Sequence, residues 1–183
     1  MEREPEPWLR GTHGELPAVV RAVVHALELA QEDAERWCGE LGNEALNARP
    51  GGIAPVAFHL RHAVRSLDRL LTYAEGGQLS AEQMAALKTE MDAGATRESM
   101  LEEFRAGIGA AMGRVRRLAG ANLEEARGVG GKGLPTTVGG LLVHCADHTQ
   151  RHVGQMVTTA RVLVTLPVSI LVVNHVDAEP TAQ

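Results

Sequence analysis

Three histidines recur at intervals of four residues in the stretch "HCADHTQRHVGQM", at His144, His148 and His152. The stretch reads as a helix, in which side chains four residues apart lie one turn apart, with Cβ atoms about 5–6 Å from each other. That distance suits two imidazoles that bind one metal ion. The apolar residues of the stretch place His148 and His152 on the buried side of the helix and rotate His144 away from it. His148 and His152 are therefore candidate metal ligands.

The competing interpretation is that His148 and His152 are ordinary core histidines held by hydrogen bonds, as a lone buried histidine usually is. Two adjacent imidazoles are harder to satisfy, because each must adopt one tautomer and bury one polar nitrogen. A shared divalent cation resolves both problems. Cys145 lies one turn before His148 and could act as a thiolate ligand or a redox group, although an inert small core residue is the favoured interpretation.

The third ligand must come from another helix, and the candidate is "FHLRHAVRSLDRLLTYAEG", residues 58–76. His59 lies nearer than His62 to the centre of the apolar stripe of this helix, so the periodicity favours His59 as the inward-facing ligand. Ser66 and Tyr73 fall on the same flank as the two histidines. This flank predicts either a small polar pocket beside the core or a solvated helix surface.

The other three histidines are predicted to carry no function. His25 lies on the side of its helix away from the apolar stripe, which predicts a solvated side chain, whereas His13 and His175 lie in terminal segments. Cys38 and Cys145 are the two cysteines of the chain. This number and their separation give no disulfide framework and fit a reducing compartment.

Helices with one apolar side must position these residues. The hydrophobic spacing predicts long helices over 16–41, 55–73 and 97–119, a short helix over 81–92, and a last helix that begins after Thr136 or Thr137 and carries the histidines. Ser80 and Gln83 form the predicted capping box of the short helix.

Three features lie outside this helical pattern. Gly107, Gly109 and Gly113 weaken the helix over 97–119, and close helix packing is the predicted reason for them. The Gly-rich stretch 120–136 lacks the Ser or Thr of a phosphate-binding loop and is predicted to be a flexible connector. The apolar stretch 161–173 fits a frayed helix end, an extended arm and a subunit contact equally well.

Length and composition define the fold class. The 183 residues suit one domain, which we assign to 1–174, with a loose tail at 175–183. Aromatic residues make up 3% of the chain, which argues against an all-β sandwich and for a helical core of Leu, Val, Ala and Met. We therefore predict an all-α fold, an antiparallel four-helix bundle with a short additional helix, and expect two copies to pair as a homodimer.

The charge and hydropathy of the chain exclude some classes of partner. A net charge of -5 leaves no basic excess to neutralise phosphates, and "RVRR" at 114–117 is the one basic cluster, so nucleic acid is not an expected partner. The N-terminal "MEREPEPWLRG" is charged rather than apolar, and no apolar run reaches the ~18 residues of a membrane span. We expect a cytoplasmic protein that makes no membrane contact.

The motifs "HLRHAVRS" and "HCADHTQRHVGQM" together resemble those of the DinB/YfiT-like family of metal-dependent four-helix-bundle proteins, over residues 16–160. In that family, one histidine of the second helix and two of the last helix bind a divalent metal, and the remaining positions are open to water or substrate. The resemblance implies His62, His148 and His152 as the ligands here, in place of the His59 that the periodicity favours.

The resemblance also implies a chemistry. Some relatives are thiol-dependent transferases or isomerases, so it implies a metal-dependent enzyme, a low-molecular-weight-thiol S-transferase that joins a small thiol to an electrophile. Nickel or zinc is the expected metal, followed by iron or manganese. The alternative is a non-catalytic metal- or ligand-binding stress-response protein. No catalytic residue is assigned, and the residues expected in the pocket or behind the ligands are His59, Ser66, Tyr73, His144 and Cys145.

Overall fold

The computed structural model of the chain describes residues 4–165, which are mostly helical with one small sheet. The elements in chain order are η1 (Pro7–Leu9), α1 (Ala18–Cys38), α2 (Asn43–Asn47), η2 (Pro50–Gly52), α3 (Val56–Ala74), α4 (Ala81–Lys88), α5 (Arg97–Arg117), β1 (Ala126–Val129), β2 (Leu134–Thr137) and α6 (Val138–Thr165). Of the apolar stretch 161–173, residues 161–165 are the end of α6. The rest of that stretch, His175 and the predicted tail at 175–183 lie outside the described residues.

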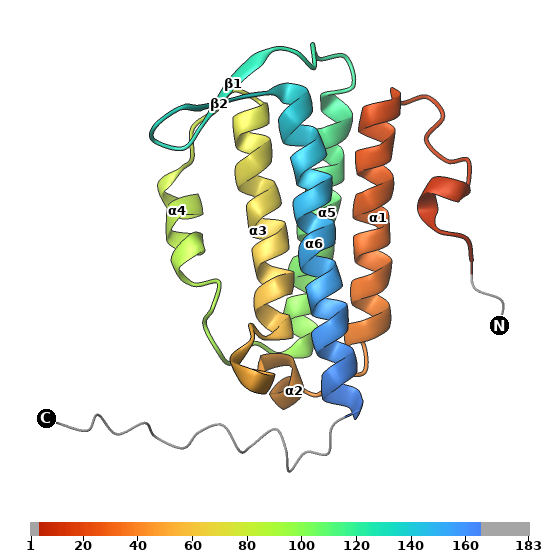
Figure 1. Cartoon of the computed structure of the whole chain (residues 1–183), viewed down its shortest axis with the longest axis vertical. Helices are drawn as coiled ribbons and strands as arrows, with labels where there is room; N and C mark the ends of the chain where they lie inside the picture. The colour runs from red at the N-terminus through yellow and green to blue at the C-terminus, as the bar shows by residue number, and fades with distance from the viewer. Residues whose placement is uncertain (1–3, 166–183) are drawn as a thin grey trace, which may run out of the picture.

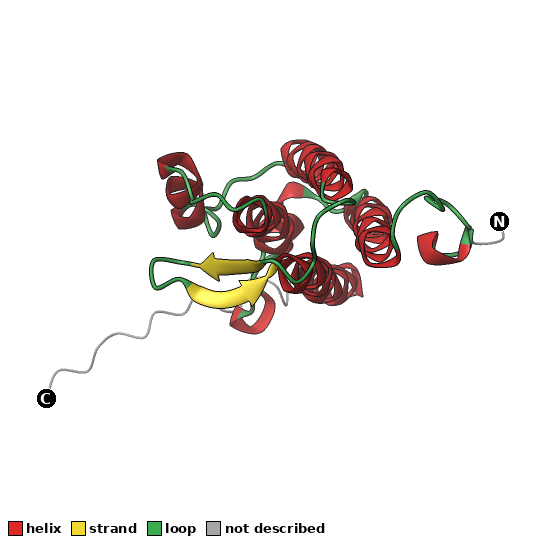
Figure 2. Cartoon of the chain, turned by 90° about the horizontal axis from the view of Figure 1, so that it is seen from above, coloured by secondary structure: helices red, strands yellow, loops and turns green. Residues whose placement is uncertain are grey.

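Four long helices, α1, α3, α5 and α6, stand side by side (Figure 1). Both α3 and α1 pack against α6 and against α5, so the four helices surround one core. Viewed from above, α4 and the N-terminal segment lie on opposite sides of the four helices (Figure 2). None of the helices in the described range is long and apolar enough to cross a membrane.

The helix directions differ in part from the predicted antiparallel arrangement. Contacts of His62 with His148 and of His59 with His152 show that α3 and α6 run antiparallel, as α1 and α5 do. The helices α3 and α5 instead run parallel, and so do α1 and α6 (Figure 1). The cause is the crossover through α4, which returns the chain along the outside of α3 before α5 begins.

Local sequence signals explain where several helices begin. The predicted capping box at α4 is confirmed, since the Gln83 backbone N–H donates to Ser80 Oγ at 3.2 Å and the Ser80 N–H donates to Gln83 Oε1 at 2.9 Å. This helix ends at Lys88, before the predicted residue 92. At the start of α6, Thr137 Oγ1 accepts the backbone N–H of Gly140 at 3.0 Å, which selects Thr137 over Thr136 as the capping side chain.

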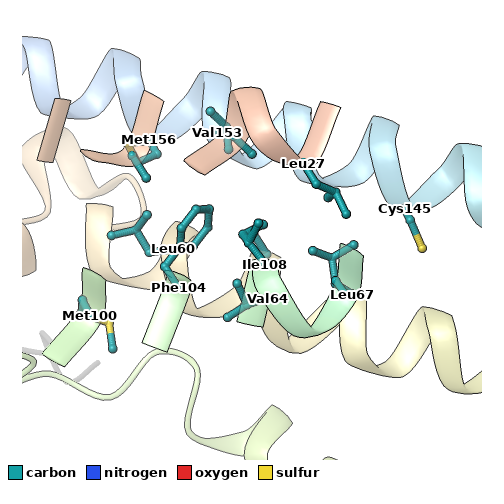
Figure 3. Packing of buried hydrophobic residues seen from close by; sticks show 14 of the residues in the cluster. Leu27, Leu60, Val64, Leu67, Met100, Phe104, Ile108, Cys145, Val153 and Met156 are labelled. Atoms are coloured by element: carbon teal, nitrogen blue, oxygen red, sulfur yellow. The ribbon is translucent and has the colours of Figure 1, made fainter. Parts of the chain in front are cut away.

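The core is built from aliphatic residues with one phenylalanine, as the composition predicts. Leu60, Val64 and Leu67 of α3 face Phe104 and Ile108 of α5 across the middle of the molecule (Figure 3). Each fully buried side chain of this size contributes roughly 1.5–3 kcal/mol relative to an exposed one. This layer fixes the rotation of α3, and with it the direction of the polar flank that bears the histidines.

One of the three glycines of α5 has the predicted packing role. A Cβ placed on Gly107 would lie 2.5 Å from Cβ of Val64, so α3 and α5 approach each other too closely there for any side chain. A Cβ on Gly109 would meet nothing within 4 Å, and one on Gly113 would meet only the Arg117 guanidinium at 3.9 Å. The predicted reason is therefore wrong for those two.

The stretch 120–136 is not the flexible connector that its glycines predict. Residues 126–129 pair antiparallel with residues 134–137, so the all-α prediction is wrong for this small sheet. The turn between them uses Gly130 and Gly133, both with positive φ, which glycine adopts without steric cost. Arg127 Nε donates to the Ala74 carbonyl at 3.0 Å and so anchors the hairpin to the end of α3.

Candidate metal centre

The antiparallel contact of α3 with α6 brings three histidines together. His62, His148 and His152 each offer one ring nitrogen, and these three nitrogens lie within 4.8 Å of one another. His62 Nε2 and His148 Nε2 are 3.1 Å apart. Two nitrogens that bind one tetrahedral zinc ion at about 2.0–2.1 Å are about 3.3 Å apart, so the spacing of this pair already fits a shared divalent cation.

A buried carboxylate stands behind His62. Glu90 is 4% exposed, and its Oε2 lies 2.6 Å from Nδ1 of His62, while its Oε1 accepts from Arg69 Nη1 at 2.7 Å. Because a carboxylate paired with an arginine accepts hydrogen bonds, His62 carries its proton on Nδ1. The lone pair of His62 Nε2 then points to the space shared with His148, as in the carboxylate–histidine–metal arrangement of many metal sites.

Glu90 is a residue that the sequence analysis missed. Arg61 of α3 donates to the carbonyls of Thr89, Glu90 and Asp92, at 3.3, 3.3 and 2.9 Å, and thereby holds the segment after α4. Arg61 belongs to a series at steps of four, with Arg65 and Arg69. This series of arginines on α3 is the sequence signal that pointed to a nearby acidic partner such as Glu90, because buried arginines need carboxylate or carbonyl partners.

His59 lies beside the group of three without belonging to it. Its Nδ1 is 3.1 Å from Nδ1 of His152, and its side chain is 6% exposed. The contact occupies one ring nitrogen of His152. The prediction that His59 faces inward is confirmed by its burial, while the structure places His62 within reach of His148 and His152.

The other predicted pocket residues separate into two groups. Ser66 is buried, lies with its Oγ 3.2 Å from His62 Nε2, and accepts from Arg69 Nη2 at 2.9 Å. Tyr73 is buried and His144 is exposed, yet both line the same cavity as Ser66 and His148. Burial of His59, Ser66 and Tyr73 excludes the alternative of a solvated helix flank.

Two cavities lie beside the histidines that α3 and α6 bring together. One, of about 360 Å³, contains His148, Ser66, Arg69 and Tyr73, together with apolar side chains of α3 and α4. The other, of about 550 Å³, contains His59 and, from α6, Arg151 and Gln155. The smaller cavity reaches the group of three directly at His148, whereas the larger one reaches it through His59, which contacts His152.

Burial keeps His59, His148 and His152 neutral. Removal from water lowers the pKa of His148 to about 4, that of His152 to about 3 and that of His59 to about 4. A positive charge on the adjacent His62 would lower each of these pKa values further. Neutral imidazole is the form that binds a metal, so protons do not compete for these ligands near neutral pH.

Both cysteines are buried and protonated. Burial raises the pKa of Cys145 to about 12, and it raises the pKa of Cys38 to about 12 as well. Cys38 Sγ lies 3.1 Å from the sulfur of Met156 within the core. Cys145 is in no cluster of potential metal ligands among residues 4–165, which fits the interpretation of an inert core residue.

The prediction for His25 is wrong. Its side chain is 7% exposed rather than solvated, because the N-terminal segment packs against this face of α1 and Thr12 Oγ1 lies 3.0 Å from His25 Nε2. His13 lies in the same segment, with its Nε2 2.7 Å from Oε1 of Glu28. Helix periodicity could not detect this cover, since residues outside the helix provide it.

Comparison with known proteins gives one family and one fold. The family model described as the DinB superfamily matches residues 26–156. The chain is similar in structure to a conserved protein from Enterococcus faecalis, with a TM-score of 0.59 and 19% sequence identity over 80% of this chain and 97% of the other. The search of curated proteins found no match. The matched family segment contains all three histidines of the candidate centre.

Proposed function

The chain belongs to the DinB superfamily, and from this membership we propose that it is a metal-dependent enzyme whose divalent cation is bound by His62, His148 and His152. The observation that carries the proposal is the convergence of three imidazoles from α3 and α6, with ligand nitrogens within 4.8 Å of one another. Zinc or nickel suits an all-imidazole donor set better than iron or manganese, which favour additional oxygen ligands.

The proposed reaction is transfer of a low-molecular-weight thiol to an electrophile. A bound divalent cation would act as a Lewis acid that lowers the pKa of a thiol or a water molecule. The protein's own residues hold His62 in one tautomer through Glu90, keep His148 and His152 neutral by burial, and line the two cavities beside the histidines. No carboxylate is among the three converging donors, so the cation would keep its full charge.

The two cavities suit two different substrates. In the larger one, Arg151 can receive a carboxylate of the thiol, because its ion pair with Asp147 at 2.6 Å is solvent-exposed and contributes little. The smaller cavity is lined mainly by apolar side chains, including Leu70, Leu79 and Leu87, and suits the electrophile.

We also propose the finer architecture and assembly that the family implies. The four long helices form a four-helix bundle with α4 as the additional helix, and two copies of the chain pair as a homodimer. The arrangement of α1, α3, α5 and α6 around one core supports the first point. Light scattering at high protein concentration tests the second, and a strictly monomeric mass contradicts it.

The test of the proposed reaction is a conjugation assay with glutathione-, mycothiol- and bacillithiol-type thiols and reactive electrophiles. Metal-loaded protein should give turnover, and metal-stripped protein and the His152→Ala variant should not. Val143→Ala, an exposed change on the same helix, is the matched control and should retain activity. If metal-loaded protein binds a thiol without turnover, the protein is a binding protein, and if it neither binds nor reacts, the transferase proposal is wrong.

A further inference from the structure

A second cluster of ligand-type side chains lies where the N-terminal segment packs against α1. Figure 1 shows this segment on the far side of α1 from α3. His25 and Glu28 are three residues apart on α1 and so share one face of the helix. His13 reaches them from the segment before α1. One ligand atom from each of these three residues lies within 4.8 Å of the other two.

Each hydrogen bond at this cluster explains the position of one pair of side chains. None of them explains why two histidines and Glu28 lie together. His13 Nε2 meets Glu28 Oε1 at 2.7 Å, and His25 Nε2 meets Thr12 Oγ1 at 3.0 Å. The two imidazole rings are 5.5 Å apart between centroids. Hydrogen bonding alone would need only one of these histidines beside Glu28, whereas a cation is satisfied by both imidazoles and the carboxylate together.

The backbone holds His13 in an uncommon conformation for this purpose. Its φ of 58° is the one positive value at a non-glycine residue in the described part of the chain. Contacts on the preceding residues hold the segment in place: Pro7 is buried, and Arg10 Nε donates to the Pro5 carbonyl at 2.7 Å. Strained backbone that is held by its surroundings is often found where a side chain must be aimed at a ligand.

The charges around the cluster permit a cation. Arg10 is the nearby positive side chain, and its guanidinium donates to both oxygens of Glu32, at 2.6 and 2.9 Å, so that its charge is balanced. Glu28 adds a negative charge among the ligands. A cavity of about 330 Å³ borders His13 and Glu28 and leaves space for a water molecule as a fourth ligand.

We propose that His13, His25 and Glu28 form a second divalent-metal site, of the zinc class, that fastens the N-terminal segment to α1. The set of two imidazoles and one carboxylate with one open position is a common zinc environment, and it also accepts iron or manganese. The site shares no residue with the centre between α3 and α6, so each can be tested without the other.

The test is a calorimetric zinc titration of the full chain in the His148→Ala/His152→Ala background, which lacks the first centre. This protein should still bind one equivalent of zinc. Adding Glu28→Gln, which keeps the size and shape of the side chain, should abolish that equivalent, and so should adding His13→Ala. The matched control, Glu35→Gln, changes a carboxylate of α1 that pairs with Arg105 outside the cluster, and it should retain the equivalent.

Limited proteolysis tests whether zinc fastens the N-terminal segment to α1. Zinc should slow tryptic cleavage after Arg10 in the wild-type chain and have no effect on cleavage in the Glu28→Gln variant. If the double-alanine background does not fold, the wild-type chain should bind two equivalents and the Glu28→Gln variant one. Equal zinc stoichiometry with and without Glu28, or binding that survives both the Glu28 and His13 changes, would show adventitious metal only and overturn the proposal.

Discussion

The two histidine clusters of this protein are built in different ways. Between α3 and α6, each of the three histidines lies on a regular helix, and buried Glu90 fixes the orientation of one of them. Under the N-terminal segment, two ligand-type residues lie on α1 and the third lies in irregular chain with a left-handed backbone. Helix packing therefore positions the first cluster, whereas the second depends on contacts that hold a short segment to the surface.

The largest expected effect is on metal affinity at the centre between α3 and α6, and only changes to the ligands of that centre should cause it. His152→Ala should weaken metal binding at the centre between α3 and α6 by about a thousandfold, equivalent to about 4 kcal/mol, because it removes one of three ligands. His13→Ala should leave that affinity unchanged. Metal content after dialysis against a graded series of chelators measures both. Loss of metal from the α3–α6 centre in the His13 variant would contradict the separation.

Loss of the carboxylate behind His62 should have a smaller effect. Glu90→Gln keeps the shape of the side chain but weakens the hydrogen bond that fixes the His62 tautomer, so metal affinity should fall roughly 10–100-fold. Zinc titration by calorimetry measures the change. Glu103→Gln, which also removes a carboxylate paired with an arginine of α3, is the control and should change affinity little.

The packing of α3 against α5, which positions the centre, can be tested without changing any metal ligand. Gly107→Ala would press a methyl group against Val64 of α3 and should lower the free energy of unfolding by about 1–3 kcal/mol. Gly109→Ala, two residues along the same helix, meets open space and should raise stability by about 0.5–1 kcal/mol. Urea unfolding of the two variants gives both values. Equal destabilisation by the two changes would mean that the helices are not in close contact at Gly107.

Burial of the histidines should also make the stability of the metal-free protein depend on pH. Folded His59 and His148 have pKa values of about 4 and His152 of about 3, against about 6.5 for an unfolded histidine. Between those values the unfolded chain binds more protons than the folded one, so the free energy of unfolding falls as pH drops from about 6.5 to about 4. Above that window the histidines are neutral in both states, and they contribute no slope.

Denaturant unfolding of metal-stripped protein across this pH range measures the slope. Carboxylates titrate at its lower end, so the comparison is with His59→Gln, which removes one of the depressed pKa values. The variant should show a shallower fall in stability than the wild-type chain. Identical slopes would mean that His59 is not buried in its neutral form.

Much of the helical part of this fold could be predicted from the sequence. Apolar spacing located the four long helices, and the Ser80–Gln83 pair located the start of α4, because both signals are local. The hairpin at 126–137 was missed because its short strands carry little apolar alternation. The parallel pairing of α3 with α5 was missed because apolar spacing within a helix says nothing of the direction of that helix relative to its neighbours.

The candidate centre was predictable to a similar degree. The four-residue spacing of His148 and His152 is a property of one helix, and it identified their shared face. The choice between His59 and His62 depends on how α3 rotates against two neighbours, and periodicity measures only the average direction of burial. Glu90 lies 28 residues from its partner in sequence, so no local pattern connects it to His62.

Anomalous diffraction at the zinc edge from crystals of zinc-loaded protein would locate the metal directly. We expect a peak between α3 and α6 at about 2.0–2.1 Å from one nitrogen of each of His62, His148 and His152. A peak that is bonded to His59 in place of His62 would show that the ligand assignment on α3 is wrong. Fully loaded crystals with no peak between these helices would contradict the metal centre itself.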